Sequence, residues 1–424
     1  MTPLRSVAIL LLSALVSSCT AQQTSTAVAY TGATIWDGTG ATAVMNATIL
    51  VDGGRIVGVG ADVDVPGGAT EVDLSGKYVI PGLIEAHGHV TGAWAPEGVT
   101  DPQDRIRGDL ELYARYGVTM VNSLGDGPDL IAVRDAASPT AGHARVMGSG
   151  AVIAGDDPAQ ARADALANAD MGADFLKLRV DDNLGAGRKM AWEAVDAVMQ
   201  VGRERNIPVA THLYYLEDAK RLLEMGTGML AHSVRDLEVD QELIAGLRES
   251  GICYVPTLVR EVSTFIYRDR PDWFDDPFFL RHASSSEMER ASQPDFMERN
   301  RSSSAEAYRI GLPQAQQNVK ILHDAGIPIA MGTDAGPAAR FPGFFEHEEL
   351  VLMAEAGLTP EEILMSATSV AAGCLMQDDI GTLQAGKWAD FLVLDENPTR
   401  DITYTQKIDQ VYVAGQPVRF KTEN

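Results

Sequence analysis

Basic residues, cysteines and long apolar segments are all scarce in this sequence. Its 34 lysine and arginine residues stand against 59 acidic residues, which leaves a formal net charge of −25. This balance disfavours nucleic acid as a partner, because the chain offers no basic surface that would neutralise phosphates. Past the N-terminus no run of about 20 apolar residues occurs, so the sequence predicts no membrane-spanning helix in the rest of the chain.

The three cysteines are too few for the disulfide framework that holds many small secreted domains together. Cys19 lies near the N-terminus, Cys253 lies in a strand-like apolar run, and Cys374 lies in a segment typical of a helix. We expect Cys253 and Cys374 to be buried free thiols. A single structural disulfide between them is the alternative.

The N-terminus has the pattern of a secretory signal, with Arg5 followed by an apolar run over residues 7–16. The Val-Ser-Ser-Cys sequence that ends at Cys19 resembles a bacterial lipobox, which implies removal of residues 1–18 and lipidation of Cys19. Ordinary cleavage near Ala21 is the alternative. Both alternatives predict export in a bacterium, to the periplasm or to the outer membrane, with membrane contact only through the lipid anchor.

Two β-rich segments frame the rest of the chain. Residues 28–80 contain short strand-like runs, two of which flank the hairpin turn Asp52-Gly53-Gly54. Similar runs return at 389–394 and 410–418. We therefore predict one small β-sandwich assembled from residues 28–80 and 381–424.

Residues 81–380 alternate between strand-like and helix-like segments, which predicts an α/β fold of the (β/α)8 TIM-barrel type. The eight predicted strands are Ile80–Val90, Gly117–Ser123, Arg145–Ile153, Asp174–Val180, Val209–Leu213, Met229–Val234, Ile252–Val259 and Ile327–Thr333. A long polar segment at 260–310 interrupts this rhythm after the seventh strand. Its length predicts a lid or binding loop over the barrel, with a plain surface insertion as the alternative.

Potential metal ligands stand at the predicted strand ends, where barrel enzymes carry their chemistry. These residues are His87, His89, Lys177, His212, His232 and Asp334. His87 and His89 are two positions apart on a strand, so their side chains point to one side and can hold one divalent ion. Taken alone, each histidine has a structural interpretation, and Lys177 could pair with an acid. Their order along the strands favours a metal site.

Three motifs resemble those of the amidohydrolase superfamily, the metal-dependent hydrolases built on a (β/α)8 barrel. The first is Pro81-Gly82-Leu83 followed by His87-Gly88-His89, the second is the Met331–Gly336 segment around Asp334, and the third is Gly381–Asp390. The resemblance is to binuclear members and covers roughly residues 80–340. Lys177 on the fourth strand and a tyrosine after His212 resemble the prolidase and dipeptidase-like, imidazolonepropionase-related branch.

The resemblance implies two divalent metal ions held by the six ligand-type residues. Zinc suits the histidine-rich set, and manganese or cobalt would also fit. Lys177 is expected to take up carbon dioxide and to bridge the metals as a carbamate. A bridging water then becomes hydroxide at neutral pH and attacks the scissile carbonyl, while Asp334 carries the proton to the leaving amine.

Substrate contacts are predicted from residues that follow the ligands. Tyr214, or its neighbour Tyr215, would donate a hydrogen bond to the carbonyl oxygen as charge develops there. Arg235 and Arg179 would bind a substrate carboxylate. The structural alternatives are core tyrosines, an ion pair of Arg235 with an acid such as Glu238, and an ion pair of Arg179 with Asp181 or Asp182.

The predicted function is amide hydrolysis by an exported metalloenzyme. Its substrates would be dipeptides or N-acyl amino acids with a free C-terminal carboxylate, including ochratoxin-type amides. One alternative keeps the metals and changes the bond, as in a lactonase or phosphotriesterase. The other is a non-catalytic metal-binding lipoprotein. The expected partner is a small molecule or dipeptide, and assembly into a homo-oligomer is left open.

Overall fold

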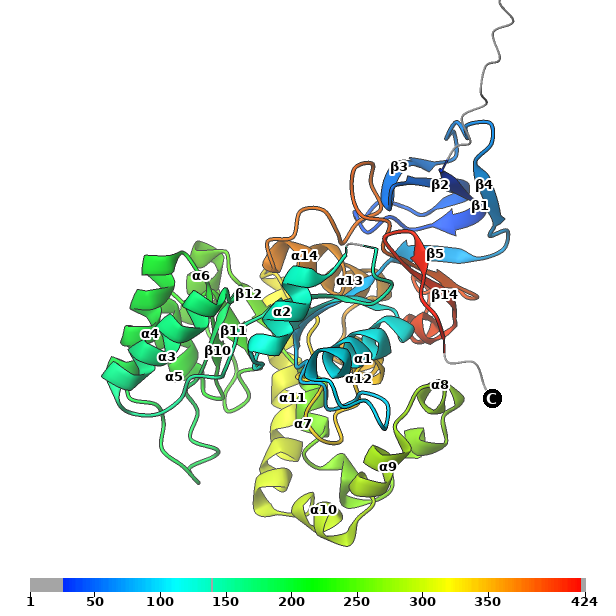
Figure 1. Cartoon of the computed structure of the whole chain (residues 1–424). Coiled ribbons are helices and arrows are strands. Elements are labelled where there is room, and N and C mark those ends of the chain that lie inside the picture. The colour runs from blue at the N-terminus through cyan, green and yellow to red at the C-terminus, as the bar shows by residue number, and fades with distance from the viewer. Residues whose placement is uncertain (1–25, 139, 421–424) are drawn as a thin grey trace, which may run out of the picture.

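The computed structural model describes residues 26–138 and 140–420, in which both ends of the chain contribute to one sheet (Figure 1). Its eight strands run in the order β15-β14-β13-β5-β1-β2-β3, with β4 paired to β1. Their bounds are β1 (Val28–Ile35), β2 (Val44–Asp52), β3 (Arg55–Gly60), β4 (Thr70–Asp73), β5 (Tyr78–Pro81), β13 (Phe391–Leu394), β14 (Ile408–Val413) and β15 (Gln416–Pro417). The antiparallel pairing of β13 with β5 joins the C-terminal strands to the N-terminal ones.

This composite sheet packs around an aromatic cluster. The ring of Tyr30 lies 5.0 Å from that of Phe391 and 4.9 Å from that of Tyr412, and the last two rings stack at 4.6 Å. All three side chains are buried together with Ile49 and Val79. The core of this sheet is therefore apolar and aromatic.

The middle of the chain forms two parallel sheets. One has the order β6-β7-β8 and the other the order β12-β11-β10-β9. Their strands are β6 (Leu83–Gly88), β7 (Val118–Ser123), β8 (Arg145–Gly148), β9 (Leu176–Arg179), β10 (Val209–His212), β11 (Met229–Ala231) and β12 (Cys253–Val255). An isolated parallel bridge between Ile153 and Leu178 links the two sheets on one side. The result is an α/β fold with parallel strands.

The predicted eighth strand, Ile327–Thr333, is not a strand in the structure. The segment makes one bridge to β12, between Ile329 and Tyr254, and the Ala86 amide of β6 donates to the Met331 carbonyl at 3.0 Å. Its remaining backbone groups bond elsewhere, since the Met331 amide donates to the Ser366 carbonyl and the Thr333 amide to the Glu85 carboxylate. The segment thus lies between β12 and β6 without a continuous ladder.

Several other strands are shorter than predicted, because side chains capture the backbone at their ends. After β8, the amides of Ser149 and Gly150 donate to Asp126 instead of to a neighbouring strand. After β12, Pro256 lacks an amide hydrogen and Thr257 has a φ of +49°, so the extended backbone stops there. The predicted first strand divides at Gly82, between β5 of the composite sheet and β6 of the parallel one.

Helices connect and cover the parallel strands (Figure 1). They are α1 (Pro102–Arg115), α2 (Pro128–Ala136), α3 (Pro158–Met171), α4 (Trp192–Arg205), α5 (Leu216–Glu224), α6 (Gln241–Ser250), α11 (Ser303–Asp324), α12 (Phe344–Glu355), α13 (Pro360–Ser366) and α14 (Ser369–Cys374). A 3-10 turn, η3 (Ile402–Gln406), precedes β14. Among the helices of residues 26–138 and 140–420, none is long and apolar enough to cross a membrane.

The segment predicted as a lid forms a lobe of short helices beside α11 (Figure 1). Its elements are α7 (Leu258–Val262), η1 (Ile266–Arg268), η2 (Asp272–Asp275), α8 (Pro277–Leu280), α9 (Ser285–Ala291) and α10 (Pro294–Arg299). Phe279 packs its ring 4.9 Å from Phe341 and 4.8 Å from Phe344, and the Tyr267 hydroxyl donates to the Ala339 carbonyl. These contacts hold the lobe against the chain that follows Asp334.

The prediction of two free thiols was wrong, because Cys253 and Cys374 form a disulfide. Their Cα atoms are 5.7 Å apart across a sequence separation of 121 residues. The bond joins the first residue of β12 to the last residue of α14. The predicted signal segment 1–18 and Cys19 lie outside the described residues.

Candidate metal centre

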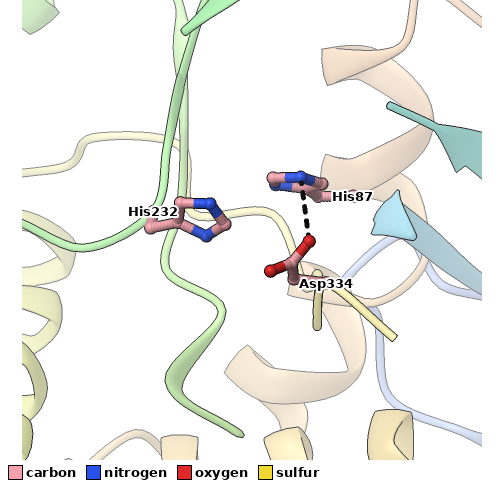
Figure 2. Close-up of side chains that lie close together, drawn as sticks. All are labelled: His87, His232 and Asp334. Carbon is pink, nitrogen blue, oxygen red and sulfur yellow. Dashed lines mark ion pairs between the residues drawn. The ribbon is translucent and has the colours of Figure 1, made fainter. Parts of the chain in front are cut away.

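The six predicted ligands converge at the carboxyl ends of the parallel strands. His87 lies near the end of β6, Lys177 in β9 and His212 at the end of β10, while His89, His232 and Asp334 follow their strand segments directly. Figure 2 shows three of them, His87, His232 and Asp334, whose ligand atoms all lie within 4.8 Å of one another. All six side chains are largely withdrawn from solvent. The spacing of His87 and His89 on one strand therefore predicted their shared direction correctly.

One half of the centre is built around the carboxylate of Asp334. Its Oδ1 lies 2.7 Å from Nε2 of His89 and 3.6 Å from Nε2 of His87. Nε2 of His87 also lies 3.2 Å from the Nζ of Lys177. Two imidazoles, an amine and a carboxylate thus point at one another from β6, β9 and the segment before Asp334.

The other half is a pair of histidines from neighbouring strands. Nδ1 of His212 lies 2.7 Å from Nε2 of His232, and their rings meet edge to face at 4.3 Å. The His232 ring also stacks on that of His87, with centroids 4.7 Å apart. The two halves are therefore in direct contact.

The outward nitrogens of three histidines are held by hydrogen-bond acceptors. Nε2 of His212 lies 2.9 Å from Oδ2 of Asp181, and Nδ1 of His232 lies 2.6 Å from Oγ1 of Thr257. Nδ1 of His89 lies 3.3 Å from the Gly125 carbonyl oxygen. When the outward nitrogen carries the proton, the inward nitrogen presents its lone pair, as a metal ligand must.

Burial keeps the imidazoles of His87, His212 and His232 neutral. It lowers the pKa of His212 to about 3, against the opposing effect of Asp181. Burial, together with neighbouring positive charge, holds the pKa of His87 and His232 well below the usual value. Because metal ions compete with protons for histidine nitrogen, neutral imidazoles are the form in which these residues bind metal.

Lys177 is buried inside β9, and this burial lowers the pKa of its amine to about 7. Its Nζ lies 3.2 Å from Nε2 of His87. No carboxylate oxygen of the described residues lies within 4.0 Å of the Lys177 amine. Lys177 is therefore not ion-paired, which was the structural alternative. The amine is thus available in its neutral, nucleophilic form near neutral pH.

Asp334 sits in an unusual backbone conformation with two arginines close by. Its φ is +59°, and its amide donates to the His87 carbonyl at 2.6 Å. Burial alone would raise its pKa, but the charge of Arg340 and the contact with His89 outweigh burial and hold the pKa well below the usual range. Nη1 of Arg340 donates to Oδ2, and Nε of Arg260 lies 3.9 Å from the same oxygen. Asp334 is therefore ionised at neutral pH.

These donor atoms fit divalent metal ions. Imidazole nitrogens, the Asp334 carboxylate and the Lys177 amine face one another in a buried space. In addition, Nδ1 of His87 is buried and has no hydrogen-bond partner within the described ranges. Such a mixture of N and O ligands is typical of zinc and similar transition metals.

The two predicted tyrosines, Tyr214 and Tyr215, have different surroundings. Tyr215 donates to Oδ1 of Asp182 at 2.9 Å and lies under the Lys189 ammonium, which places it at the outer edge. Tyr214 is buried, and burial raises the pKa of its hydroxyl. Its ring lies beneath the guanidinium of Arg235, 4.6 Å from the ring centroid.

Of the two predicted arginines, only Arg235 is buried. Its Nε lies 3.3 Å from Glu261 Oε2, so its acidic neighbour is Glu261 and the suggested partner Glu238 was wrong. Glu238 instead accepts from Gln317. Arg179 forms the alternative ion pair, with Nε 3.0 Å from Oδ1 of Asp181, and its side chain is about 37% exposed.

Several supporting residues were missed by sequence reasoning. Glu85 is the clearest, because its buried carboxylate accepts from the His87 amide at 2.6 Å and from the Thr333 amide at 3.0 Å. It thereby joins the two segments that carry His87 and Asp334. A charged residue inside an otherwise apolar strand, two positions before a ligand, was the signal that could have found it. Arg260, Arg340 and Thr257 had no comparable signal, since each lies in α7 or in a loop. Asp181 was considered only as an ion-pair partner of Arg179, and its contact with His212 was missed.

Comparison with known proteins gives a consistent result. Residues 78–418 match the profile of the amidohydrolase family. An imidazolonepropionase of Deinococcus radiodurans is 28% identical, over 88% of this chain and 92% of that protein.

Two solved structures share the fold. A Xaa-Pro dipeptidase with methionine bound in its active site has a TM-score of 0.72 at 22% identity, and the likeness covers 92% of this chain and 99% of that one. A prolidase complexed with N-methylphosphonate-L-proline has a TM-score of 0.73 at 22% identity, over 93% of this chain and 100% of that one. With the family match over most of its length and a site that suits metal, the chain belongs to the amidohydrolase family, in the branch related to prolidases and imidazolonepropionases, and is a metal-dependent hydrolase of carbon–nitrogen bonds.

Proposed function

We propose that the protein cleaves the amide bond of dipeptides or N-acyl amino acids that carry a free C-terminal carboxylate. The observation that carries this proposal is a cluster of buried arginines beside Asp334. Arg235 and Arg260 share the carboxylate of Glu261, and all three side chains are buried. Even with the Arg340–Asp334 pair included, the cluster keeps one positive charge. A substrate carboxylate would neutralise it, which relieves the cost of a buried unpaired charge.

Unused hydrogen-bond donors support the same proposal. Nη2 of Arg235 and Nε of Arg260 are buried and have no acceptor among residues 26–138 and 140–420. Arg260 also donates from Nη2 to the Tyr308 hydroxyl at 3.5 Å, and its guanidinium lies over the Tyr308 ring. Of Arg235 and Arg260, only Arg260 lies within 4 Å of the Asp334 carboxylate, so it is the first candidate for contact with the substrate carboxylate, with Arg235 behind it. The related prolidase binds N-methylphosphonate-L-proline, a compound that ends in an amino-acid carboxylate.

The metal-holding residues would be His87, His89, Lys177, His212, His232 and Asp334, with zinc as the favoured metal. Two bound divalent ions would supply a polarised substrate carbonyl and a water of lowered pKa. Lys177 would react with carbon dioxide to form a carbamate and release a proton, which its lowered pKa favours. The carbamate would add an anionic ligand between the two halves of the centre.

Proton transfer falls to Asp334. Because its carboxylate is ionised, it can accept the proton of the attacking water and then deliver it to the leaving amine. His89 and Arg340 fix the two carboxylate oxygens, which keeps the group oriented. Tyr214 retains its hydroxyl proton, because burial raises its pKa, and would donate a hydrogen bond to the carbonyl oxygen as charge develops there.

Arg179 and Tyr215 are better placed at the rim of the metal centre than for contact with the substrate carboxylate. Arg179 is paired with Asp181 and Tyr215 with Asp182. Since Asp181 also holds His212, Arg179 would act on the metal centre through that carboxylate.

For the architecture we infer a (β/α)8 barrel, with residues 327–333 in the eighth position. The Ile153–Leu178 bridge joins the two parallel sheets, and the Tyr254–Ile329 bridge joins β12 to that segment; both support this inference. We also infer export, because a disulfide suits an oxidising compartment and is rare in the bacterial cytoplasm. Mass spectrometry of the membrane fraction tests lipidation, and a mature N-terminus beyond Cys19 would contradict it.

The test of function is a substrate panel with metal-loaded protein. It contains dipeptides, N-acyl amino acids including ochratoxin-type amides, their C-terminal amides, lactones and a phosphotriester. We expect turnover only of substrates with a free carboxylate. We also expect Arg260→Gln to raise KM by a larger factor than it lowers kcat. Turnover of a lactone or phosphotriester with amides untouched would overturn the substrate assignment. Metal binding without any turnover would favour a binding protein.

A further inference from the structure

A cavity of about 550 Å³ lies directly beside the metal centre. Its lining includes His89, Ile106, Gly125, Asp126, Leu130 and Val152. His89 is one of the proposed ligands, and the Gly125 carbonyl holds its outward nitrogen. The cavity therefore continues from the metal centre over the ends of β6, β7 and β8.

The floor of this cavity is shaped by Gly125 and Val152. A Cβ at Gly125 would lie 2.9 Å from Cε1 of His89 and 3.0 Å from Cγ2 of Val152, so these two side chains flank the glycine. Val152 is 41% exposed although it is a large apolar side chain. Ile106 and Leu130 complete the apolar wall. An apolar side chain exposed inside a cavity next to a reaction centre indicates contact with an apolar ligand group.

The Asp126 carboxylate is already engaged inside the cavity wall. Its two oxygens accept from the amides of Ser149 and Gly150, each at 3.0 Å. Arg105 donates to the Val99 carbonyl at 3.1 Å, and Asp129 is exposed in the first turn of α2. The apolar wall around Val152 therefore decides the kind of occupant, and it favours an aliphatic group.

The cavity and the arginine cluster lie at the ends of different sheets. The cavity covers the ends of β6, β7 and β8, whereas Arg235 and Arg260 follow β11 and β12. A substrate whose carboxylate reaches Arg260 would place its amide carbonyl at the metal centre and extend its acyl part toward His89. From this arrangement we infer that the cavity is the acyl subsite, and that it takes a long aliphatic acyl chain rather than a short acyl group. This inference rests on the proposed function and adds the substrate class.

The test compares N-formyl-, N-acetyl-, N-hexanoyl- and N-octanoyl-L-methionine. In the wild type, kcat/KM rises with chain length by about fourfold for each methylene that the cavity buries. Val152→Trp fills the floor and removes this rise, so N-octanoylmethionine loses about tenfold or more while N-formylmethionine changes by less than about twofold. Val44→Trp is the matched control, because Val44 is a valine of similar exposure, 43%, on β2 of the composite sheet.

A second readout does not depend on turnover. Octanoate and acetate are titrated into the metal-loaded wild type and into Val152→Trp, and binding is measured by calorimetry. Tighter binding of octanoate by the wild type alone supports the inference. Equal octanoate binding by the two proteins, or acyl-length independence of kcat/KM, overturns it. If the protein cleaves none of the N-acylmethionines, the proposed function is overturned separately, and the octanoate titration still decides whether the cavity binds an acyl chain.

Discussion

Two buried ring clusters of this protein have similar packing and opposite energetics. In the composite sheet, Tyr30, Phe391 and Tyr412 meet at centroid distances of 4.6–5.0 Å. At the metal centre, the rings of His212 and His87 lie 4.3 and 4.7 Å from that of His232. Burial of the first cluster stabilises the fold through removal of apolar area from water. Burial of the second costs stability and keeps the imidazoles neutral, so that they are prepared for metal.

The largest effect is expected at the metal centre. Asp334→Asn removes the proton acceptor and one ligand oxygen, so kcat should fall by about 10³-fold or more. Steady-state kinetics and metal analysis measure the change. Asp109→Asn is the control, since Asp109 is also a buried carboxylate but accepts only from loop amides such as Gly92 and Trp94. A kcat for Asp334→Asn within tenfold of the wild type would contradict the assigned role.

The aromatic cluster should respond in stability instead. Phe391→Ala leaves a cavity between Tyr30 and Tyr412, and should lower the free energy of unfolding by about 3–5 kcal/mol. At 25 °C, kcat of the folded protein should stay unchanged. Chemical denaturation with parallel kinetics tests both statements, with the exposed Val57→Ala as control. A large loss of kcat in a fully folded variant would show that the two regions are coupled.

The effect of the disulfide is expected to lie between those of the metal centre and the aromatic cluster. The bond fixes β12 but does not contact a candidate metal ligand. Replacement of Cys253 and Cys374 by alanine should lower the free energy of unfolding by about 2–5 kcal/mol, since the bond closes a loop of 121 residues. Denaturation of the wild type with and without reductant provides the comparison. A double variant as stable as the oxidised protein would argue against this contribution.

A smaller effect is expected for the residue that orients His232. Thr257→Val removes the acceptor of Nδ1 at nearly constant shape, and should weaken metal affinity by about 10- to 100-fold. Competition with a chelator measures this affinity. Thr211→Val is the control, because the buried Thr211 hydroxyl bonds to Thr227 and Met229, away from the histidines. Equal metal affinity of the two variants would refute the orienting role.

The pH dependence of metal reconstitution sharpens the comparison further. The pKa of Lys177 is lowered to about 7, so the amine is neutral above this pH and protonated below it. Carbon dioxide reacts with the neutral amine. When metal and bicarbonate are added so that the concentration of dissolved carbon dioxide is the same at each pH, reactivation of metal-free protein should slow by up to about tenfold per pH unit below 7. Reactivation rates at pH 6, 7 and 8 test this, with Lys177→Gln as the variant that should not respond to bicarbonate. A bicarbonate-independent rate in the wild type would speak against a carbamate.

The convergence of the six candidate ligands was largely predictable because their positions follow local rules. His87 and His89 share a strand face by their spacing. His212, His232 and Asp334 lie at the ends of strand-like runs and Lys177 lies within one, and parallel strands bring these positions to one edge. Arg260 could not be found in this way, since its place beside Asp334 depends on how α7 packs against a distant segment. The Cys253–Cys374 bond likewise depends on where α14 ends in space.

Strand lengths were predicted less well than strand positions. Apolar sequence continues past the ends of β8 and β12, but Asp126 captures the next amides after β8, and Pro256 stops the ladder after β12. Residues 327–333 have the sequence pattern of a strand but do not form one. Their amides donate to the Glu85 carboxylate and to the Ser366 carbonyl instead of to a neighbouring strand. Competition between side chains and neighbouring strands is a tertiary property, which hydrophobic patterning does not contain.

The pairing of β13 with β5 has a consequence for the order of events during biosynthesis. The strands β1 to β5 are synthesised first, yet the edge of β5 is completed only by residues 391–394, close to the end of the described chain. Until then β5 exposes an unpaired edge, immediately before the strand that carries His87. The nascent chain therefore cannot finish its first sheet, or secure the start of its catalytic half, before nearly all of it has been made.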